Sequence, residues 1–411
     1  MRKFVFITLA ALTMLSCKKE VPIPFLPEEY VFTGDYSSLT PYSVTLTGTV
    51  NPTSSMREIS MGIYLSKNPE PSEYNSSTYR IYDGNNTFSH EFTGLEPETT
   101  YYYKAFMYHR EGFTLEKWDY GEIKSFTTPA NSITTTFDYI VAGVSSVYLR
   151  GSVSIEYESP RYAYSSLITG DSRAAVINRG QDADTYYLGT ERTFEITAFG
   201  MKEGGMYYRT CVVLGDEEYL GEIQYVSPRE FVPTDGEVID MGLSVKWRSR
   251  NVGADSPEEG GNYYSWGETS TKSFYTSEHY THPEGDPLVL PLTMDAASVN
   301  LGGKWRMPTR EEFLELDEKC LCGAGEYNSM PGLLVVSKIN GNAIFFPAAG
   351  FNASSAVGNY GSQGKYWSST AEAINPQCVY SLFFSLPFTW TYLPVSSSST
   401  AYFGASIRPV M

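Results

Sequence analysis

Residues 302–314 read GGKWRMPTREEFL and contain the clearest helix start of the chain. Thr309 is a good N-cap residue, and Glu312 three positions later completes a capping box. Apolar residues then recur at helical spacing as far as Cys320, which predicts a helix over 310–322. The rest of the chain is typical of strands and turns. We therefore expect an α+β domain around this helix and mostly β structure elsewhere.

The composition favours β-rich extracellular modules. The 411 residues suffice for two to four domains, each with its own core. Charged residues make up only 19% and aromatic residues 15%, with 33 Tyr and 35 Gly, which suits strands and turns better than helical enzymes. The formal net charge of −17 argues against binding to nucleic acid or to anionic membrane surfaces.

The N-terminus has the pattern of an export signal. A basic start, Arg2-Lys3, precedes an apolar run over 4–15 that is too short to span a bilayer as a helix. A small residue and Cys17 follow, and this ending resembles a bacterial lipobox, which implies cleavage before Cys17 and acylation of its thiol. A plain secretory signal is the alternative. We expect a lipoprotein signal over 1–17, a tether over 18–29, and attachment to the outer membrane through the lipid alone, on its periplasmic or external face.

Residues 30–129 are expected to form a β-sandwich. Short runs of alternating hydrophobicity are separated by turn signals at the spacing of such a fold. The expected strands cover 43–50, 58–66, 87–92, 100–109 and 121–127. The motif LEPETTY at 95–101 resembles the fibronectin type III pattern in which a Leu and a Tyr pack a corner, and the closing run over 120–129 resembles the last strand of that module.

Residues 130–230 contain a diverged second copy of this module. LRGSV at 149–153 parallels LTGTV at 46–50. The corner motif is missing, so we describe the copy as fibronectin type III-like or Ig-like, and the polar run 177–185 is expected to be a loop. Neither copy concentrates His, Cys or paired acids. We interpret both as spacers, with an independent binding role as the alternative.

Residues 234–411 form the third domain, which contains the opening segment. It carries seven motifs in order: VIDMGLSVKW (238–247), NVGA (251–254), NYYSWGET (262–269), WRMPT (305–309), IFFPAAG (344–350), YWSST (366–370) and SIRPV (406–410). Together they resemble the Fibrobacter succinogenes major paralogous (FISUMP) domain, common in surface lipoproteins of Bacteroidetes. The resemblance implies a C-type-lectin-like fold, as in the formylglycine-generating enzyme group and in the variable proteins of diversity-generating retroelements.

The local patterns of this domain add further elements. Besides 310–322 we expect a helix over 295–300. The expected strands cover 343–348, 378–385 and 401–409, and the irregular segments cover 351–365 and 387–400. Arg306 and Arg408 are expected to pin loops through carboxylate or backbone contacts. The whole chain is thus predicted to be mostly β, with two fibronectin type III/Ig-like β-sandwiches followed by an α+β C-type-lectin-like domain.

The domain shows no catalytic set. A nucleophile elbow, a phosphate loop and a calcium loop are all missing from its sequence. His279 and His282 lie in a polar loop with no helix to fix their spacing, which favours a solvated loop over a metal site. Cys320-x-Cys322 is a poor zinc signature, and these thiols are expected to be free or to form one optional bridge with Cys378. We expect no enzyme activity and no cofactor, with an enzyme of the formylglycine-generating type as a remote alternative.

The segment 368–403 contains the candidate recognition surface. Within it, alternating residues of 378–385 are expected to face the core, and burial is the alternative to exposure for Phe388, Trp390 and Tyr392. The segment is rich in aromatic residues, Ser and Thr, and its one charged residue is Glu372. Aromatic rings supply rigid contact area, and hydroxyls supply adaptable hydrogen bonds. The candidate ligand-binding residues are Phe388, Trp390, Tyr392 and Tyr402. The first three alternate along the chain and share one face if the segment is extended.

These features lead to one main hypothesis and one alternative. The main hypothesis is a non-catalytic cell-surface lipoprotein whose C-terminal domain serves adhesion by binding a protein or glycan. The alternative is a glycan-binding accessory protein of a polysaccharide-capture system. Coplanar exposed aromatic rings would favour the glycan, and a mixed surface of aromatic, Ser and Thr residues would favour a protein.

Overall fold

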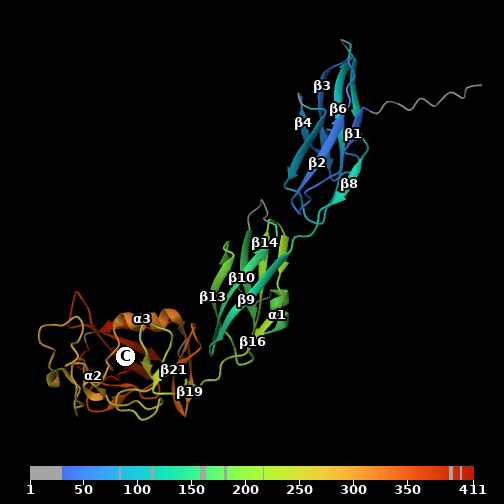
Figure 1. The fold of residues 1–411 in the computed structure, drawn as a ribbon. Helices are drawn as coiled ribbons and strands as arrows, with labels where there is room; N and C mark the ends of the chain where they lie inside the picture. Colours follow the sequence, from blue (N-terminus) through green and yellow to red (C-terminus); the bar gives the residue numbers. More distant parts are fainter. Residues whose placement is uncertain are drawn as a thin grey trace, which may run out of the picture. The chain divides into compact units, whose positions relative to one another are not determined.

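The computed structural model describes residues 30–411 except 83–84, 113–114, 158–162, 180–182, 216, 388–391 and 399. The chain divides into two compact units, Met1–Asn131 and Ser132–Met411. Antiparallel strands dominate both units, so the expectation of a mostly β chain is confirmed (Figure 1). The expected signal segment, Cys17 and the tether lie outside the described residues. Among the described residues, no helix combines the length and apolar character needed to cross a bilayer.

The first unit is a sandwich of two antiparallel sheets. One sheet has the order β1-β2-β5, and the other has the order β4-β3-β6-β7, with β8 also paired to β6. The strands are β1 (Val31–Thr33), β2 (Ser43–Val50), β3 (Met56–Ser66), β4 (Ser77–Ile81), β5 (Thr87–Thr93), β6 (Thr100–Glu111), β7 (Leu115–Tyr120) and β8 (Lys124–Thr127). Three strands face five, and β7 and β8 pair with successive parts of β6 as one interrupted edge strand, which is the fibronectin type III-like arrangement that the sequence predicts.

The expected strands and the expected corner are present in this sandwich. The Tyr101 hydroxyl accepts a hydrogen bond from the backbone N–H of Glu96 at 3.0 Å, and Leu95 is buried in the same core. The run 121–127 is strand only from Lys124 onward. Strand β7 was not predicted, because its sequence LEKWDY is charged and lacks apolar alternation. Its charges pair with β6 instead, as in the 2.7 Å contact between Arg110 and Glu116.

A second sandwich opens the second unit. Its sheets have the orders β13-β10-β9 and β12-β11-β14-β15, with β16 paired to β14. The elements are β9 (Ile133–Ala142), β10 (Ser146–Ile155), β11 (Ala163–Gly170), α1 (Arg173–Asn178), β12 (Ala183–Gly189), β13 (Thr193–Phe199), β14 (Met206–Leu214), β15 (Glu217–Leu220) and β16 (Gln224–Val226). The expected loop over 177–185 is therefore wrong in part, since α1 ends within it and β12 begins within it. Its polar sequence fits an edge strand that faces water.

In both sandwiches, a glycine of the repeated motif pairs with a phenylalanine on the neighbouring strand. Gly48 on β2 pairs with Phe88, and Gly151 on β10 pairs with Phe194. A Cβ atom at either glycine would lie within 2.7 Å of that phenylalanine ring. Each ring therefore fills the space that a side chain would occupy.

The third domain contains short helices and small sheets (Figure 1). Its sheets have the orders β17-β18, β19-β20-β21, β22-β23 and β24-β25-β26. The elements are β17 (Val238–Ile239), β18 (Trp247–Arg248), the 3-10 turn η1 (Ser277–His279), α2 (Ala296–Leu301), α3 (Arg310–Lys319), β19 (Cys320–Tyr327), β20 (Met330–Ser337), β21 (Ala343–Pro347), β22 (Phe351–Asn352), β23 (Val357–Gly358), β24 (Gln363–Ala371), β25 (Val379–Ser385) and β26 (Val395–Ser398). Its cores include the fully buried Trp247, Trp266 and Trp367.

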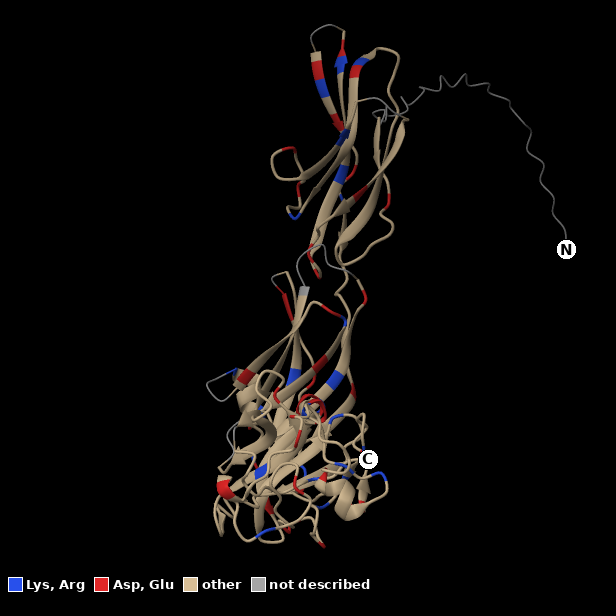
Figure 2. Cartoon of the chain, turned by 90° about the vertical axis from the view of Figure 1, so that its left-hand side faces the viewer, with Lys and Arg blue, Asp and Glu red and all other residues tan. Residues whose placement is uncertain are grey.

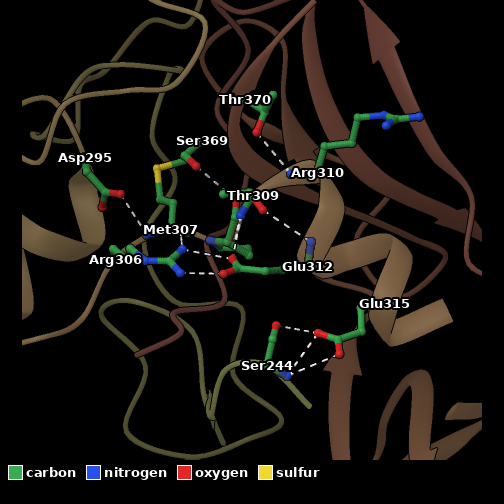
Figure 3. Close-up of polar contacts among 11 residues, drawn as sticks. Ser244, Asp295, Arg306, Met307, Thr309, Arg310, Glu312, Glu315, Ser369 and Thr370 are labelled. Atoms are coloured by element: carbon green, nitrogen blue, oxygen red, sulfur yellow. Dashed lines mark hydrogen bonds and ion pairs between the residues drawn. The ribbon is translucent and has the colours of Figure 1, made fainter. Parts of the chain in front are cut away.

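The helix start in the opening segment is confirmed. Thr309 accepts a hydrogen bond from the N–H of Glu312 at 3.3 Å, and the Glu312 carboxylate accepts one from the N–H of Thr309 at 2.8 Å (Figure 3). Arg306 pairs with the same carboxylate and donates to the carbonyl of Met307 at 3.0 Å, as predicted for a loop-pinning residue. The buried Asp295 accepts from the N–H of Met307 at 2.8 Å. The Glu312 carboxylate thus caps α3 and also holds the segment before it through Arg306.

Four predictions for this domain need correction. The helix ends at Lys319, and the expected 320–322 portion is the start of strand β19. The expected strand 401–409 forms isolated bridges to several separate segments instead of one ladder. The segments expected to be irregular, 351–365 and 387–400, contain β22, β23, the start of β24 and β26. Arg408 is fully buried and donates to the Asn251 side chain at 2.9 Å, so its partner is an amide instead of a carboxylate or backbone group.

The second sandwich and the third domain share a hydrophobic cluster within the second unit. Val141 is buried with Leu321, Leu334 and Phe345, and Phe231 packs against them. Glycines on β19 permit this approach, because a Cβ atom at Gly323 would lie 2.6 Å from Val144, and one at Gly325 would lie 2.5 Å from Phe231. The backbone of β19 is therefore a packing surface for the sandwich.

Candidate functional site

Four half-buried rings form what we call the aromatic cluster of the third domain: Phe351, Phe383, Tyr402 and Phe403. Phe351 stacks on Phe403 with ring centroids 5.5 Å apart and an interplanar angle of 16°. Tyr402 meets Phe403 edge-on at 85°, and Phe383 meets Phe351 at 67°. The rings come from β22, β25 and the turn after β26, so tertiary contacts assemble the cluster.

Backbone pairing fixes the position of this cluster. Asn352 and Gly404 exchange two backbone hydrogen bonds of 2.7 and 2.8 Å, which places Phe351 beside Phe403. A Cβ atom at Gly404 would lie 2.8 Å from the ring of the buried Tyr275. The close approach therefore favours glycine at this position.

Lys365 on β24 lies beneath the cluster and is only 7% exposed. Its Nζ lies 4.7 Å from the ring centroid of Trp367, 5.6 Å from Phe403 and 6.0 Å from Phe351. The ammonium donates to the Thr400 hydroxyl at 3.1 Å. Burial lowers the pKa of Lys365 to about 8, because an apolar setting disfavours the charged form.

This buried cation has no acidic partner among the described residues. None of the carboxylates among the described residues forms an ion pair with Lys365. The sequence gives the reason, since residues 351–411 contain a single acid, Glu372, against two bases, Lys365 and Arg408. A buried ammonium is costly unless an anion or several hydrogen-bond acceptors compensate it. The site can therefore accept a carboxylate or other anion brought by a ligand.

The structure does not bring the described members of the four predicted site residues together. Tyr402 belongs to the aromatic cluster. Tyr392 is 52% exposed and precedes Leu393, whose N–H donates to Asp317 near the end of α3. Tyr392 and Tyr402 are thus anchored to different elements. Phe388 and Trp390 lie outside the described residues.

Sequence reasoning missed Lys365 and Phe351 as site residues. Both fall in the segment 351–365, which was expected to be irregular. A lysine beside Tyr366-Trp367 in an acid-poor stretch is a signal that could have identified Lys365. Phe351 carries no such signal, because its neighbour Phe403 is distant in sequence.

The other residues considered for chemistry have separate partners. The Nδ1 atom of His279 lies 2.8 Å from the Thr276 hydroxyl, whereas Nε2 of His282 lies 3.1 Å from Asp286. Cys320 and Cys322 are free thiols on β19, as is Cys378 next to β25. Burial raises the pKa of Cys320 to about 12 and also raises that of Cys322. Among the described residues, no group of three or more His, Cys, Asp or Glu could hold a metal ion.

Comparisons with known proteins find similarity to solved structures only. No protein-family model and no curated protein sequence matches the chain. Among solved structures, a two-domain fibronectin type III segment from chicken tenascin is 10% identical, covers 48% of this chain and 99% of its own length, and has a TM-score of 0.23. The FN1–FN3 domains of chicken CNTN1 are 10% identical, cover 49% and 68%, and have a TM-score of 0.19. Both TM-scores are low, so the sandwich assignment rests on the strand orders described above.

Proposed function

We propose that the chain is a non-catalytic cell-envelope lipoprotein whose C-terminal domain recognises a protein ligand through the aromatic cluster and Lys365. The observation that carries this proposal is a buried ammonium beneath half-exposed rings, with no acidic partner in the part of the chain that the structure describes. Aromatic residues dominate the energetics of many protein interfaces, and a desolvated cation adds specificity for an anionic group. A ligand that brings a carboxylate to Lys365 would use both.

The ring geometry favours a protein over a glycan at this site. Only Phe351 and Phe403 are close to parallel, while Tyr402 and Phe383 stand at steep angles to their neighbours. Sugar rings need flat exposed aromatic faces, whereas a mixed surface suits protein side chains. The hydroxyl of Thr400 beside Lys365 adds a polar contact of the adaptable kind.

The envelope location and the C-type-lectin-like fold belong to the same proposal. The lipobox-like ending at Cys17 supports a lipid anchor in the outer membrane, and the seven ordered motifs of residues 234–411 support the FISUMP resemblance. In this arrangement the two sandwiches hold the recognition domain away from the membrane. The raised pKa values of Cys320 and Cys322 disfavour the thiolates that a formylglycine-generating enzyme would need.

The test is a binding screen with residues 18–411, the mature chain without the acylated Cys17, on arrays of host proteins, neighbouring-cell proteins and glycans. The cluster variant carries Tyr402→Ala and Lys365→Met. A matched control, Tyr360→Ala, removes an exposed tyrosine of the same domain that is outside the cluster. Circular dichroism checks that every variant is folded.

We expect a protein ligand whose affinity falls at least about tenfold in the cluster variant, which corresponds to about 1.4 kcal/mol. The control should bind as the wild type does. If no protein on the arrays binds, or if the folded cluster variant binds unchanged, this site is not the recognition surface. A variant with Phe388→Ala, Trp390→Ala and Tyr392→Ala tests the other predicted ligand-binding residues in the same screen.

A further inference from the structure

The outer face of one sheet in the first sandwich carries a second aromatic layer. The core of this sandwich lies on the opposite face of the sheet, where Met61, Ile63 and Met107 are buried. On the outer face, the almost fully buried rings of Tyr64 and Phe106 stack with centroids 4.3 Å apart. The strands involved, β4, β3 and β6, lie side by side (Figure 1). A face that only met water would be polar, so this layer sets the sheet apart from a simple spacer.

A hollow of about 630 Å³ opens in this layer. Ser60 on β3 pairs with Tyr108 on β6, and Tyr108 pairs with Trp118 on β7. Directly paired residues point to the same face, so the small Ser60 lies beside two aromatic residues. Tyr82, which follows β4 and is 72% exposed, also lines the hollow. The volume lies within the range of about 300–1,000 Å³ that is typical of small-ligand sites.

Arg80 supplies a fixed donor to this hollow. Its guanidinium carbon lies 5.1 Å from the ring centroid of Phe106 and 5.1 Å from that of Trp118. The rings cover the faces of the guanidinium, and one of its edge nitrogens lies 3.6 Å from the Glu73 carboxylate, which leaves the other N–H groups for a ligand. The opening is therefore lined by aromatic surface and by a positioned donor.

A β-bulge brings further polar groups to the rim. The register between β3 and β6 shifts between Arg57 and Ser60, and Glu58 adopts a positive φ of 51°. Glu58 pairs with Arg110 at 2.8 Å, so charges of both signs lie close together on this sandwich (Figure 2). The buried Ser60 hydroxyl has no hydrogen-bond partner among the described residues. Such unsatisfied groups and strained residues cluster at binding sites.

We infer that this hollow binds about one or two pyranose rings of a neutral glycan. Donors on Arg57 and Arg80 stand beside an acceptor on Glu58, which suits hydroxyl groups because each hydroxyl both donates and accepts. The exposed ring of Tyr82 offers a free aromatic face against which the C–H groups of a pyranose can pack. A peptide added as a strand fits less well, because the bulge interrupts the regular backbone pairing that strand addition needs. The inference is independent of the C-terminal site.

The test uses isothermal titration calorimetry on the mature chain with defined neutral oligosaccharides: maltohexaose, cellohexaose, mannohexaose, xylohexaose and chitohexaose. An octaproline peptide serves as the competing class of ligand. Tyr82→Ala removes an exposed wall of the hollow, and Ser60→Val fills its floor. Tyr74→Ala is the matched control, because Tyr74 is a 95% exposed tyrosine of the same sandwich that does not line the hollow.

We expect at least one oligosaccharide to bind with a dissociation constant of about 1 mM or tighter. Tyr82→Ala or Ser60→Val should weaken it at least about tenfold, while Tyr74→Ala should change it less than about twofold. The inference is overturned if none of the oligosaccharides binds, if only octaproline binds, or if both hollow variants bind as the wild type does. If Lys365→Met loses oligosaccharide binding while Tyr82→Ala retains it, the glycan binds to the third domain, and the inference about the hollow is overturned as well.

Discussion

Lys365 makes the stability of the third domain depend on pH. Its pKa is lowered by burial to about 8, while an unfolded lysine titrates near 10.4. Below pH 8 the side chain is protonated in both states, and burial of the charge lowers stability. Above pH 8 the unfolded state binds more protons than the folded state, so the free energy of unfolding rises with pH. We predict a rise on the order of 2 kcal/mol between pH 7.5 and 9.5.

Urea unfolding followed by tryptophan fluorescence measures this effect, because five of the six tryptophans lie in the third domain: Trp247, Trp266, Trp305, Trp367 and Trp390. Lys365→Met should be more stable than the wild type at pH 7.5 and should not show the rise. The exposed Lys304→Met is the control and should retain it. A rise of equal size in Lys365→Met would show that other groups cause it.

At the scale of elements, the paired glycines of the two sandwiches give a second prediction. A Cβ atom at Gly48 would lie 2.6 Å from the Phe88 ring, whereas one at Gly151 would lie 2.2 Å from the backbone oxygen of Thr136. We expect Gly48→Ala to lower the free energy of unfolding of its sandwich by about 1–3 kcal/mol. Gly151→Ala should lower it more, because a ring can shift more easily than a paired backbone.

Hydrogen exchange measured by mass spectrometry can localise both effects. Peptides of β2 and β5 should exchange faster in Gly48→Ala, and peptides of β9, β10 and β13 in Gly151→Ala. Gly204→Ala is the control, since a Cβ atom there meets nothing within 4 Å. Unchanged exchange in Gly151→Ala would contradict the packing explanation of the repeat.

Elements with strong local signals could be predicted from the sequence, and those fixed by tertiary contacts could not. Helix α3 begins where its capping box predicts, because the cap is a contact between residues three apart. Its end was misplaced because Gly323 resembles a helix stop, whereas its actual role is to admit Val144 of another domain. The site shows the same division. Tyr402 could be predicted from composition. Its neighbours Lys365 on β24 and Phe351 on β22 could not, because backbone pairing of residues 404–406 with these two strands brings them to it.

At the scale of the whole molecule, the second sandwich contributes to the stability of the third domain. Val141, Val144 and Phe231 pack against the outer surface of the β19-β20-β21 sheet, where Leu321 and Phe345 are buried. Removing the sandwich would expose these apolar side chains to water. We predict that a chain of residues 234–411 unfolds with a free energy about 2–5 kcal/mol below that of a chain of residues 132–411.

Tryptophan fluorescence reports this difference directly, because residues 132–233 contain no tryptophan. Gly323→Ala separates packing from other effects of truncation, since a Cβ atom at Gly323 would lie 2.6 Å from Val144. In the longer chain this change should lower the urea midpoint. In the shorter chain Val144 is absent, and the same change should leave the midpoint unchanged or raise it, because alanine restricts the unfolded state more than glycine does. Equal effects of Gly323→Ala in the two chains would mean that the sandwich is a spacer with no share in the stability of the domain it precedes.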